Sequence, residues 1–202
     1  MLQVSASGLQ TEFFPRFRPW LIVFGLTLLF SPFSWGEIVL EKNHHQYAVR
    51  VLQPVAASCT RVWSLLTDYD HLAQWVPDMI FSRRIIPSPE QPLNGNGRFL
   101  VAQTGRAHFL FFGRDIHVRL WVTELLQSQI NMELADGDFE VFSAQYSLQP
   151  KDGQCELRYT ALMKPNFFVP PLIGTRLFKQ QLQKKFTAIL QRAEHGPQPS
   201  NR

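Results

Sequence analysis

The chain lacks the short motifs on which the most familiar enzyme chemistries depend. It has no Gly-x-Ser-x-Gly, no His-Glu-x-x-His, no glycine-rich phosphate loop and no Cys-x-x-Cys. The sequence therefore gives no indication of a serine hydrolase of that type, a zinc protease, a P-loop enzyme or a thioredoxin-like protein. His44 and His45 would point to opposite sides of an extended segment, and we do not expect them to bind a metal. We predict no catalytic residue, no metal site and no cofactor.

Charge is also scarce, since only 18% of the residues are charged and the net charge is +4 at pH 7. This excess is too small to favour a nucleic acid as partner. Basic residues gather late in the chain, at Arg176, Lys179, Lys184, Lys185 and Arg192. We interpret them as a solvated helix face, with attraction to anionic lipid headgroups as the alternative.

The chain has only two cysteines. Cys59 is expected at the start of the first helix and Cys155 at the start of the last strand. An oxidising compartment would permit one bridge between them. An even number of cysteines permits a bridge without indicating one, so we expect two buried, unbridged thiols.

Long apolar runs are absent except for one short block near the N-terminus, at residues 20–30, which follows Arg16 and Arg18. The sequence Ser34-Trp35-Gly36 then ends in the small-x-small pattern that signal peptidases cut. We predict a signal peptide over residues 1–36 and export across a bacterial inner membrane into the periplasm. The block is short for a hydrocarbon core of about 30 Å, and an uncleaved inner-membrane anchor is the alternative.

Apolar residues make up 45% of the chain and aromatic residues 13%, which is typical of a globular protein with a sizeable core. Seventeen phenylalanines stand against four tyrosines, and phenylalanine offers a large contact area without a hydrogen-bonding group. We expect one ligand-binding domain over residues 37–196 and a disordered tail over 197–202.

Alternation of apolar and polar residues predicts an antiparallel sheet. Asp136-Gly137 and Asp152-Gly153 each join two strands, and residues 94–97 favour a further hairpin. The predicted strands cover residues 47–52, 79–86, 99–103, 109–124, 129–135, 139–148 and 155–164. Their alternating apolar residues should share one concave face.

Helical spacing appears in two places. Val62, Leu65 and Leu66 follow Ser58, a residue suited to an N-cap, and a second short helix is expected over 71–75, where Pro77 stops it. From Leu172 to Gly196 the apolar residues lie on one side of a long helix. The predicted order is a strand, two short helices, about six strands and a long helix.

The segment 62–77 reads Val-Trp-x-x-Leu-x-Asp-Tyr-x-x-Leu-x-x-x-x-Pro. It resembles the START-like (SRPBCC) superfamily, which includes the polyketide cyclase/dehydrase group and the coenzyme Q-binding proteins, and the resemblance covers roughly residues 46–194. It implies an α+β helix-grip fold of the START-like or Bet v 1-like kind. In that fold a curved antiparallel sheet surrounds a long C-terminal helix and leaves an apolar cavity. The element order derived from periodicity is the same.

The predicted function is binding of a hydrophobic small molecule in this cavity, for transport, sequestration or sensing, without chemistry. The coenzyme Q-binding branch implies a quinone or another isoprenoid lipid. Each side chain of the predicted lining has packing within the core as its alternative role. The predicted ligand-binding residues are Trp75, Val118, Leu120, Met132, Phe142, Tyr146, Tyr159, Met163, Phe167, Phe178 and Leu182.

Two segments carry bulky apolar residues on predicted loops, residues 109–113 and 164–172. Loops normally lie at the surface. We expect Phe167 and Phe168 either to form a lid or rim that touches a membrane transiently, or to plug the end of the core.

Two other functions stay open. One is an aromatase/cyclase or dehydratase that acts on a polyketide-like substrate, which would require at least two ionisable side chains inside the cavity. The other is an interaction module with a collapsed cavity. The candidates for ionisable groups in the cavity alternate with apolar neighbours, and we expect them on the outer face. They are Arg83, Arg98, Arg119, Glu133, Glu140 and Arg158.

Overall fold

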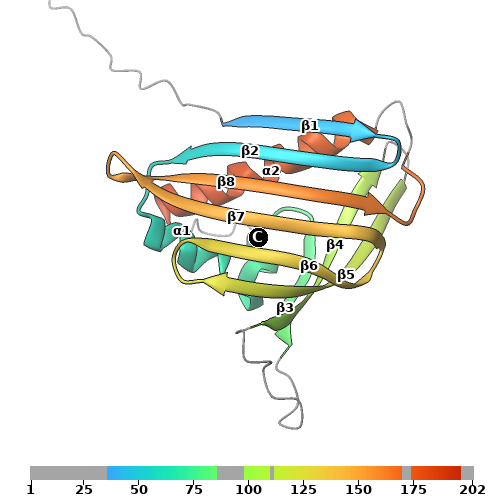
Figure 1. Cartoon of the computed structure of the whole chain (residues 1–202), viewed down its shortest axis with the longest axis horizontal. Helices are drawn as coiled ribbons and strands as arrows, with labels where there is room; N and C mark the ends of the chain where they lie inside the picture. Colours follow the sequence, from blue (N-terminus) through green and yellow to red (C-terminus); the bar gives the residue numbers. More distant parts are fainter. Residues whose placement is uncertain (1–35, 86–97, 110–111, 170–173, 197–202) are drawn as a thin grey trace, which may run out of the picture. The chain divides into compact units, whose positions relative to one another are not determined.

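The computed structural model describes residues 36–85, 98–109, 112–169 and 174–196, which form a curved antiparallel sheet around a long helix (Figure 1). This is the predicted helix-grip fold. The predicted signal peptide, the turn at 94–97 and the tail at 197–202 lie outside the described residues. Within them, no helix is both long and apolar enough to cross a membrane.

The sheet has eight strands in the order β1-β2-β8-β7-β6-β5-β4-β3, so that β8 lies beside β2 although the two are distant in sequence. All neighbouring strands are antiparallel. The strands are β1 (Glu37–Asn43), β2 (Gln46–Val55), β3 (Met79–Ile85), β4 (Phe99–Phe109), β5 (Phe112–Leu125), β6 (Gln129–Gly137), β7 (Phe139–Lys151) and β8 (Gln154–Pro165).

The pairing register shifts at three places, at Ile80 of β3, at Ala135 of β6 and at Glu140 of β7, where each strand has one extra residue. Such bulges kink a strand and increase its twist. The apolar sets on β5 to β8 lie on the inner side of the bent sheet, as predicted, and Leu120, Ile130 and Leu157 are almost completely buried.

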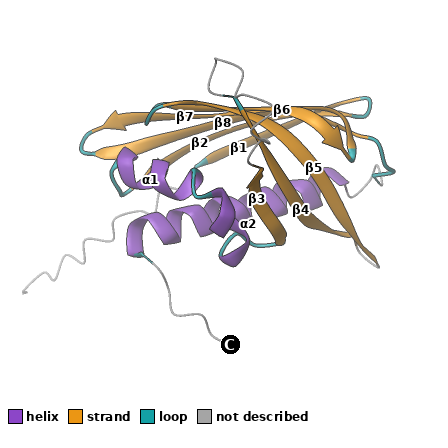
Figure 2. Cartoon of the chain, turned by 90° about the horizontal axis from the view of Figure 1, so that it is seen from below, coloured by secondary structure: helices purple, strands orange, loops and turns teal. Residues whose placement is uncertain are grey.

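Three helices lie against the concave face (Figure 2). They are α1 (Cys59–Leu66), the short 3-10 helix η1 (Tyr69–Gln74) and α2 (Gly174–His195). Ser58 caps α1, since its side chain accepts a hydrogen bond from the Arg61 amide at 3.3 Å. Asp70 fastens η1 to β3 because its carboxylate accepts from the amide of Arg84 at 2.8 Å.

Two expectations about strands were wrong. β1 was not predicted, because its half-buried residues Ile38, Val39 and Leu40 are consecutive and show no alternation. The single strand expected over residues 109–124 is the end of β4 followed by β5, which pair with each other as far as Phe109 and Phe112. An apolar run that continues from one strand into the next resembles a single buried strand in sequence.

The expectation of two free thiols was also wrong, because Cys59 and Cys155 form a disulfide. Their positions at the start of α1 and near the start of β8 are as predicted. The pairing of β2 with β8 sets Cys155 opposite Val55, and α1 begins four residues after Val55. The bridge therefore follows from a strand register that the sequence alone does not reveal.

Candidate functional site

A cavity of about 230 Å³ lies between the concave face of the sheet and α2 and is partly open to solvent. The lining comes from the end of α1, from η1 and the turn after it, from strands β3 to β8 and from one face of α2. The cavity exists because the bent sheet stands away from the helix in this region, and the side chains between them do not fill the space.

Ten of the eleven side chains predicted to bind a ligand line this cavity. The exception is Phe167, whose ring packs on that of Phe139 with centroids 6.2 Å apart, while the Arg114 guanidinium lies 4.7 Å from its centroid. Phe139 does line the cavity, so Phe167 supports the wall from behind. The ten that line it are Trp75, Val118, Leu120, Met132, Phe142, Tyr146, Tyr159, Met163, Phe178 and Leu182.

Aromatic rings form much of the wall. Tyr146 and Tyr159 lie with ring centroids 4.6 Å apart, and Tyr159 also contacts Phe186 of α2 at 5.6 Å. Burial raises the pKa of Tyr146 to about 12 and that of Tyr159 well above its ordinary value. Both phenols are therefore neutral at physiological pH, and neither hydroxyl makes a hydrogen bond to another described residue. They can donate to an acceptor atom of a guest.

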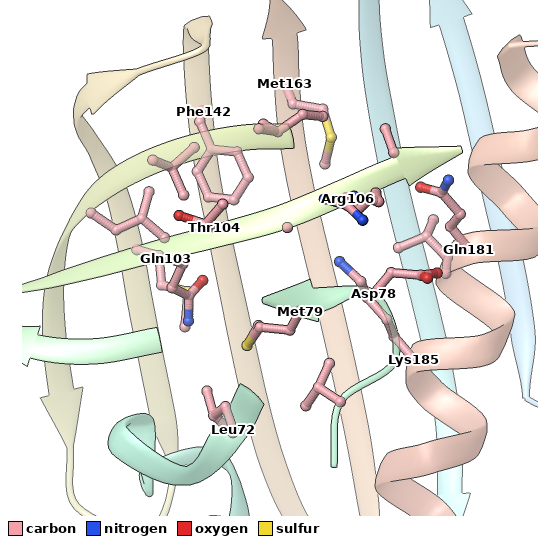
Figure 3. A pocket seen from close by; sticks show the side chains of 18 of the residues that line it. Leu72, Asp78, Met79, Gln103, Thr104, Arg106, Phe142, Met163, Gln181 and Lys185 are labelled. Atoms are coloured by element: carbon pink, nitrogen blue, oxygen red, sulfur yellow. The ribbon is translucent and has the colours of Figure 1, made fainter. Parts of the chain in front are cut away.

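One side of the cavity is polar. Figure 3 shows the Lys185 side chain extending from α2 into the cavity, on the side where Asp78, Arg106 and Gln181 lie. Burial lowers the pKa of the Lys185 ammonium below its ordinary value, and the negative charge of Asp78 partly opposes this shift. Gln103 and Thr104 add two neutral polar groups from β4.

The charged side chains on the polar side of the cavity differ in whether a group of opposite charge pairs with them. The Arg106 guanidinium makes two hydrogen bonds to the Asp115 carboxylate, of 2.7 and 3.1 Å, and hydrogen bonding to Arg106 holds the pKa of Asp115 below its usual range. His108 Nε2 lies 3.1 Å from Asp78 Oδ1. Lys185 has no ion pair and no hydrogen bond to any described residue. It is the uncompensated cation of the cavity wall among the residues described.

The sequence interpretation missed this lysine. Lys185 was assigned to a solvated face, and that was wrong, although its neighbour Lys184 is exposed as expected. Lys185 stands three residues after Leu182 and four before Ile189, both of which face the core, so the helical spacing would have placed it correctly. Asp78 and Arg106 offered no such pattern, because their positions depend on the turn after η1 and on the register of β4.

The six charged residues considered for the cavity do not line it, as predicted. Most of them pair with neighbours on the outer side. Arg98 binds Glu133 at 2.9 Å and Arg158 binds Glu156 at 2.7 Å, while Arg119 pairs with Asp136 and Glu140 with Lys164. Arg83 is exposed.

Comparison with known proteins supports the fold. Residues 55–189, more than half of the chain, match the model of the family described as polyketide cyclase / dehydrase and lipid transport. No curated protein sequence matches the chain.

Among solved structures, a START superfamily protein from Mycobacterium smegmatis aligns with a TM-score of 0.58 at 19% identity, over 73% of this chain and 97% of that one. A STAR-related lipid transfer protein from Xanthomonas axonopodis aligns at 0.56 and 12% identity, over 78% and 99%. The Zhui aromatase/cyclase from Streptomyces sp. R1128 aligns at 0.55 and 13% identity, over 74% and 94%. At such identities the likeness establishes the fold alone.

Proposed function

Because the chain belongs to the polyketide cyclase/dehydrase and lipid-transport family, we propose that it binds a hydrophobic small molecule in the cavity between its sheet and α2. The observation that carries the proposal is a preformed, largely apolar space with a partial opening to solvent. Small-molecule sites are usually preformed concave spaces of this kind, with a few polar groups that orient the guest. The protein would hold its guest for transport, sequestration or sensing without changing it.

The size of the cavity limits the guest. About 230 Å³ is below the roughly 300–1,000 Å³ of common ligand sites, and it corresponds to about eight groups the size of a water molecule. A quinone-like or isoprenoid lipid, which the family resemblance suggests, would place its ring or one end of its chain inside. The rest of a long chain would have to leave through the opening.

Filling the cavity tests the proposal. The neutral fluorescent probe N-phenyl-1-naphthylamine should bind the wild-type protein, and Val118→Phe should weaken its binding at least about tenfold, which corresponds to about 1.4 kcal/mol. Val118 lines the cavity on β5. The matched control is Val141→Phe on β7, a position that is 38% exposed and outside the lining. Equal binding by wild type and both variants would refute an internal site.

The natural guest can be identified by native mass spectrometry of protein purified from the cells that make it, followed by organic extraction. A bound lipid of defined mass supports the proposal. A reproducibly empty protein that also fails to bind the probe would favour the interaction module.

Catalysis on a polyketide-like substrate is the second candidate, and one observation favours it. Asp78, Arg106 and Lys185 all line the cavity, so more than two ionisable side chains meet there. An amine with a lowered pKa is suited to proton transfer. Incubation with a poly-β-ketone mimic should then give a product of altered mass, and Lys185→Met should abolish it. A mimic recovered unchanged favours binding without chemistry.

We also infer export to an oxidising compartment. The disulfide between Cys59 and Cys155 supports this, because such bridges persist mainly outside the reducing cytosol, and it agrees with the predicted signal peptide. Cell fractionation with thiol alkylation should find the protein in the periplasm with both cysteines blocked. An uncleaved membrane anchor would instead leave the full-length mass in the membrane fraction.

Transient membrane contact is a further part of the proposal, supported by Phe168. It follows β8, and its side chain is 75% exposed. Phe168→Ser should reduce co-flotation with anionic liposomes, whereas Leu126→Ser in the β5–β6 turn, 81% exposed, should not. Equal flotation of both variants would contradict a role for Phe168 at the membrane.

A further inference from the structure

Lys185 is an unusual wall residue for a cavity that takes apolar guests. Its ammonium points into a space lined mostly by aromatic and aliphatic side chains (Figure 3). Taking a charge out of water is costly unless a partner of opposite charge accompanies it. The described residues supply no hydrogen-bonding or ion-pairing partner to Lys185, so in the empty protein this cost is not offset by a contact.

The nearby charges do not fill that role. Asp115 takes both hydrogen bonds of Arg106, and the carboxylate of Asp78 is in contact with His108. The residue Asp78 also has a φ of +60°, a backbone conformation that few residues other than glycine adopt readily. The negative charge of Asp78 raises the pKa of Lys185 without a hydrogen bond between them, and this is smaller than the lowering of that pKa by burial.

The apolar wall lies close to the lysine on the same helix. Leu182, three residues before Lys185, and Phe186, the residue after it, line the cavity together with Phe142 and Met163. A molecule in this space would meet an ammonium at one side and rings and methyl groups elsewhere. The arrangement matches a short amphipathic acid, with its carboxylate at Lys185 and its hydrocarbon part among the rings.

We propose that the guest of this cavity carries a carboxylate, or a comparable anionic head, that pairs with Lys185. This inference rests on the proposed function and names the chemical class of the ligand. An anion at this point supplies the missing counter-charge and hydrogen-bond acceptor. A neutral head could still accept hydrogen bonds from Gln103, Thr104 or the tyrosine hydroxyls, so charge is the property to be tested.

The test uses octanoate, octan-1-ol and octylamine as competitors for bound N-phenyl-1-naphthylamine, with protein purified from cells that express the full chain. The three compounds share one hydrocarbon chain and differ in the charge of the head. Octanoate should displace the probe at a concentration about ten- to hundredfold lower than octan-1-ol, which is the range for a hydrogen bond to a charged group. Octylamine should be the weakest.

Lys185→Met keeps the apolar stem and removes the charge. In this variant octanoate should lose its advantage over octan-1-ol, and the competition by octan-1-ol should not weaken. The matched control is Lys184→Met, which removes the adjacent, exposed lysine of the same helix and should change nothing. The wild-type comparison needs no substitution, so the inference is tested even if Lys185→Met does not fold.

The outcomes separate this inference from the proposed function. If the probe binds but octanoate and octan-1-ol compete equally, the anionic head is refuted and the hydrophobic site stands. If octanoate is preferred by wild type and by Lys185→Met alike, an anion is recognised elsewhere and Lys185 is not its partner. If no probe binds, both the proposed function and this inference fail.

Discussion

The two halves of α2 use the same helical face for different purposes. Towards its C-terminal end, Leu190 and Ala193 are buried against the rest of the core, and the Arg61 guanidinium of α1 donates hydrogen bonds to the backbone carbonyls of Arg192 and Ala193. Towards its N-terminal end, Phe178, Leu182 and Lys185 border the cavity. The C-terminal half, called the packed half below although Phe186 and Ile189 at its start also line the cavity, holds the fold together. The N-terminal half leaves space for a guest.

The disulfide belongs to the packed half. It joins α1 to β8, beside the end of the sheet where Val55 pairs with Cys155. The packed half of α2 therefore lies near a covalent bond, a buried apolar cluster and the contacts of Arg61. We expect the part of α2 beside the cavity to be held less firmly. Stability and binding should then respond to different substitutions, and four measurements test this division.

Removal of the disulfide should have the largest effect. The bridge spans 96 residues of sequence, and closing a loop of that length stabilises a protein by about 4–5 kcal/mol through the unfolded state. Cys59→Ala with Cys155→Ala should lower the free energy of unfolding by roughly that amount, measured by denaturant titration. Wild type kept in reductant is the control and should match. An unchanged midpoint would show that the packed half does not need the bridge.

A pair of identical substitutions on α2 compares the halves directly. Leu190 is 4% exposed and Leu182 is 8% exposed, but only Leu182 borders the cavity. Leu190→Ala should cost about 3–4 kcal/mol because it leaves a new void. Leu182→Ala should cost about 1.5–2 kcal/mol, close to the transfer free energy alone, since it enlarges an existing space. Chemical denaturation measures both, and equal costs would contradict the division.

The contact between α1 and the end of α2 should contribute less. Arg61→Ala removes the hydrogen bonds to the carbonyls of Arg192 and Ala193, which we expect to cost about 1 kcal/mol. Arg176→Ala, an exposed position in the first turn of the same helix, should stay within about 0.5 kcal/mol of wild type. A larger loss for Arg176→Ala would show that the cavity end of α2 is anchored as well.

Acidification should produce the smallest change. The Asp138 carboxylate accepts a hydrogen bond from the amide of His117 at 2.8 Å and one from Arg114 at 3.2 Å. The first of these is the main cause that lowers the pKa of Asp138. The contribution of the Asp138 carboxylate to stability is therefore complete at pH values above the ordinary carboxylate pKa. It is lost as the pH falls through the lowered pKa of Asp138. Thermal unfolding of wild type and Asp138→Asn should differ by less than about 1 kcal/mol at pH 7.

The difference between those two proteins should shrink below about pH 4, since a protonated Asp138 resembles asparagine. Asp136→Asn is a useful comparison, because the pKa of Asp136 is lowered mainly by its exposed pairing with Arg119. A difference between wild type and Asp138→Asn that grows on acidification would contradict the assignment.

How much the sequence could predict depended on the range of the interaction. Alternation and turn residues act locally, and they were sufficient for most of the sheet, for the long helix and for ten of the predicted wall residues, but not for β1 or for the boundary between β4 and β5. The disulfide required the register of β2 against β8, which joins residues about a hundred positions apart. To place Lys185 in the cavity wall, one would have had to assign a charged residue to the apolar face of α2. Charged residues usually lie on the solvated face, so this assignment was not made.

The wall of the cavity is assembled from nearly the whole domain, beginning at Leu66 and ending at Ile189 on α2. Since α2 follows all the strands in the sequence, a chain that has not yet made α2 has no enclosed space. The guest can be acquired only once α2 has been made, so loading and the docking of α2 should occur together.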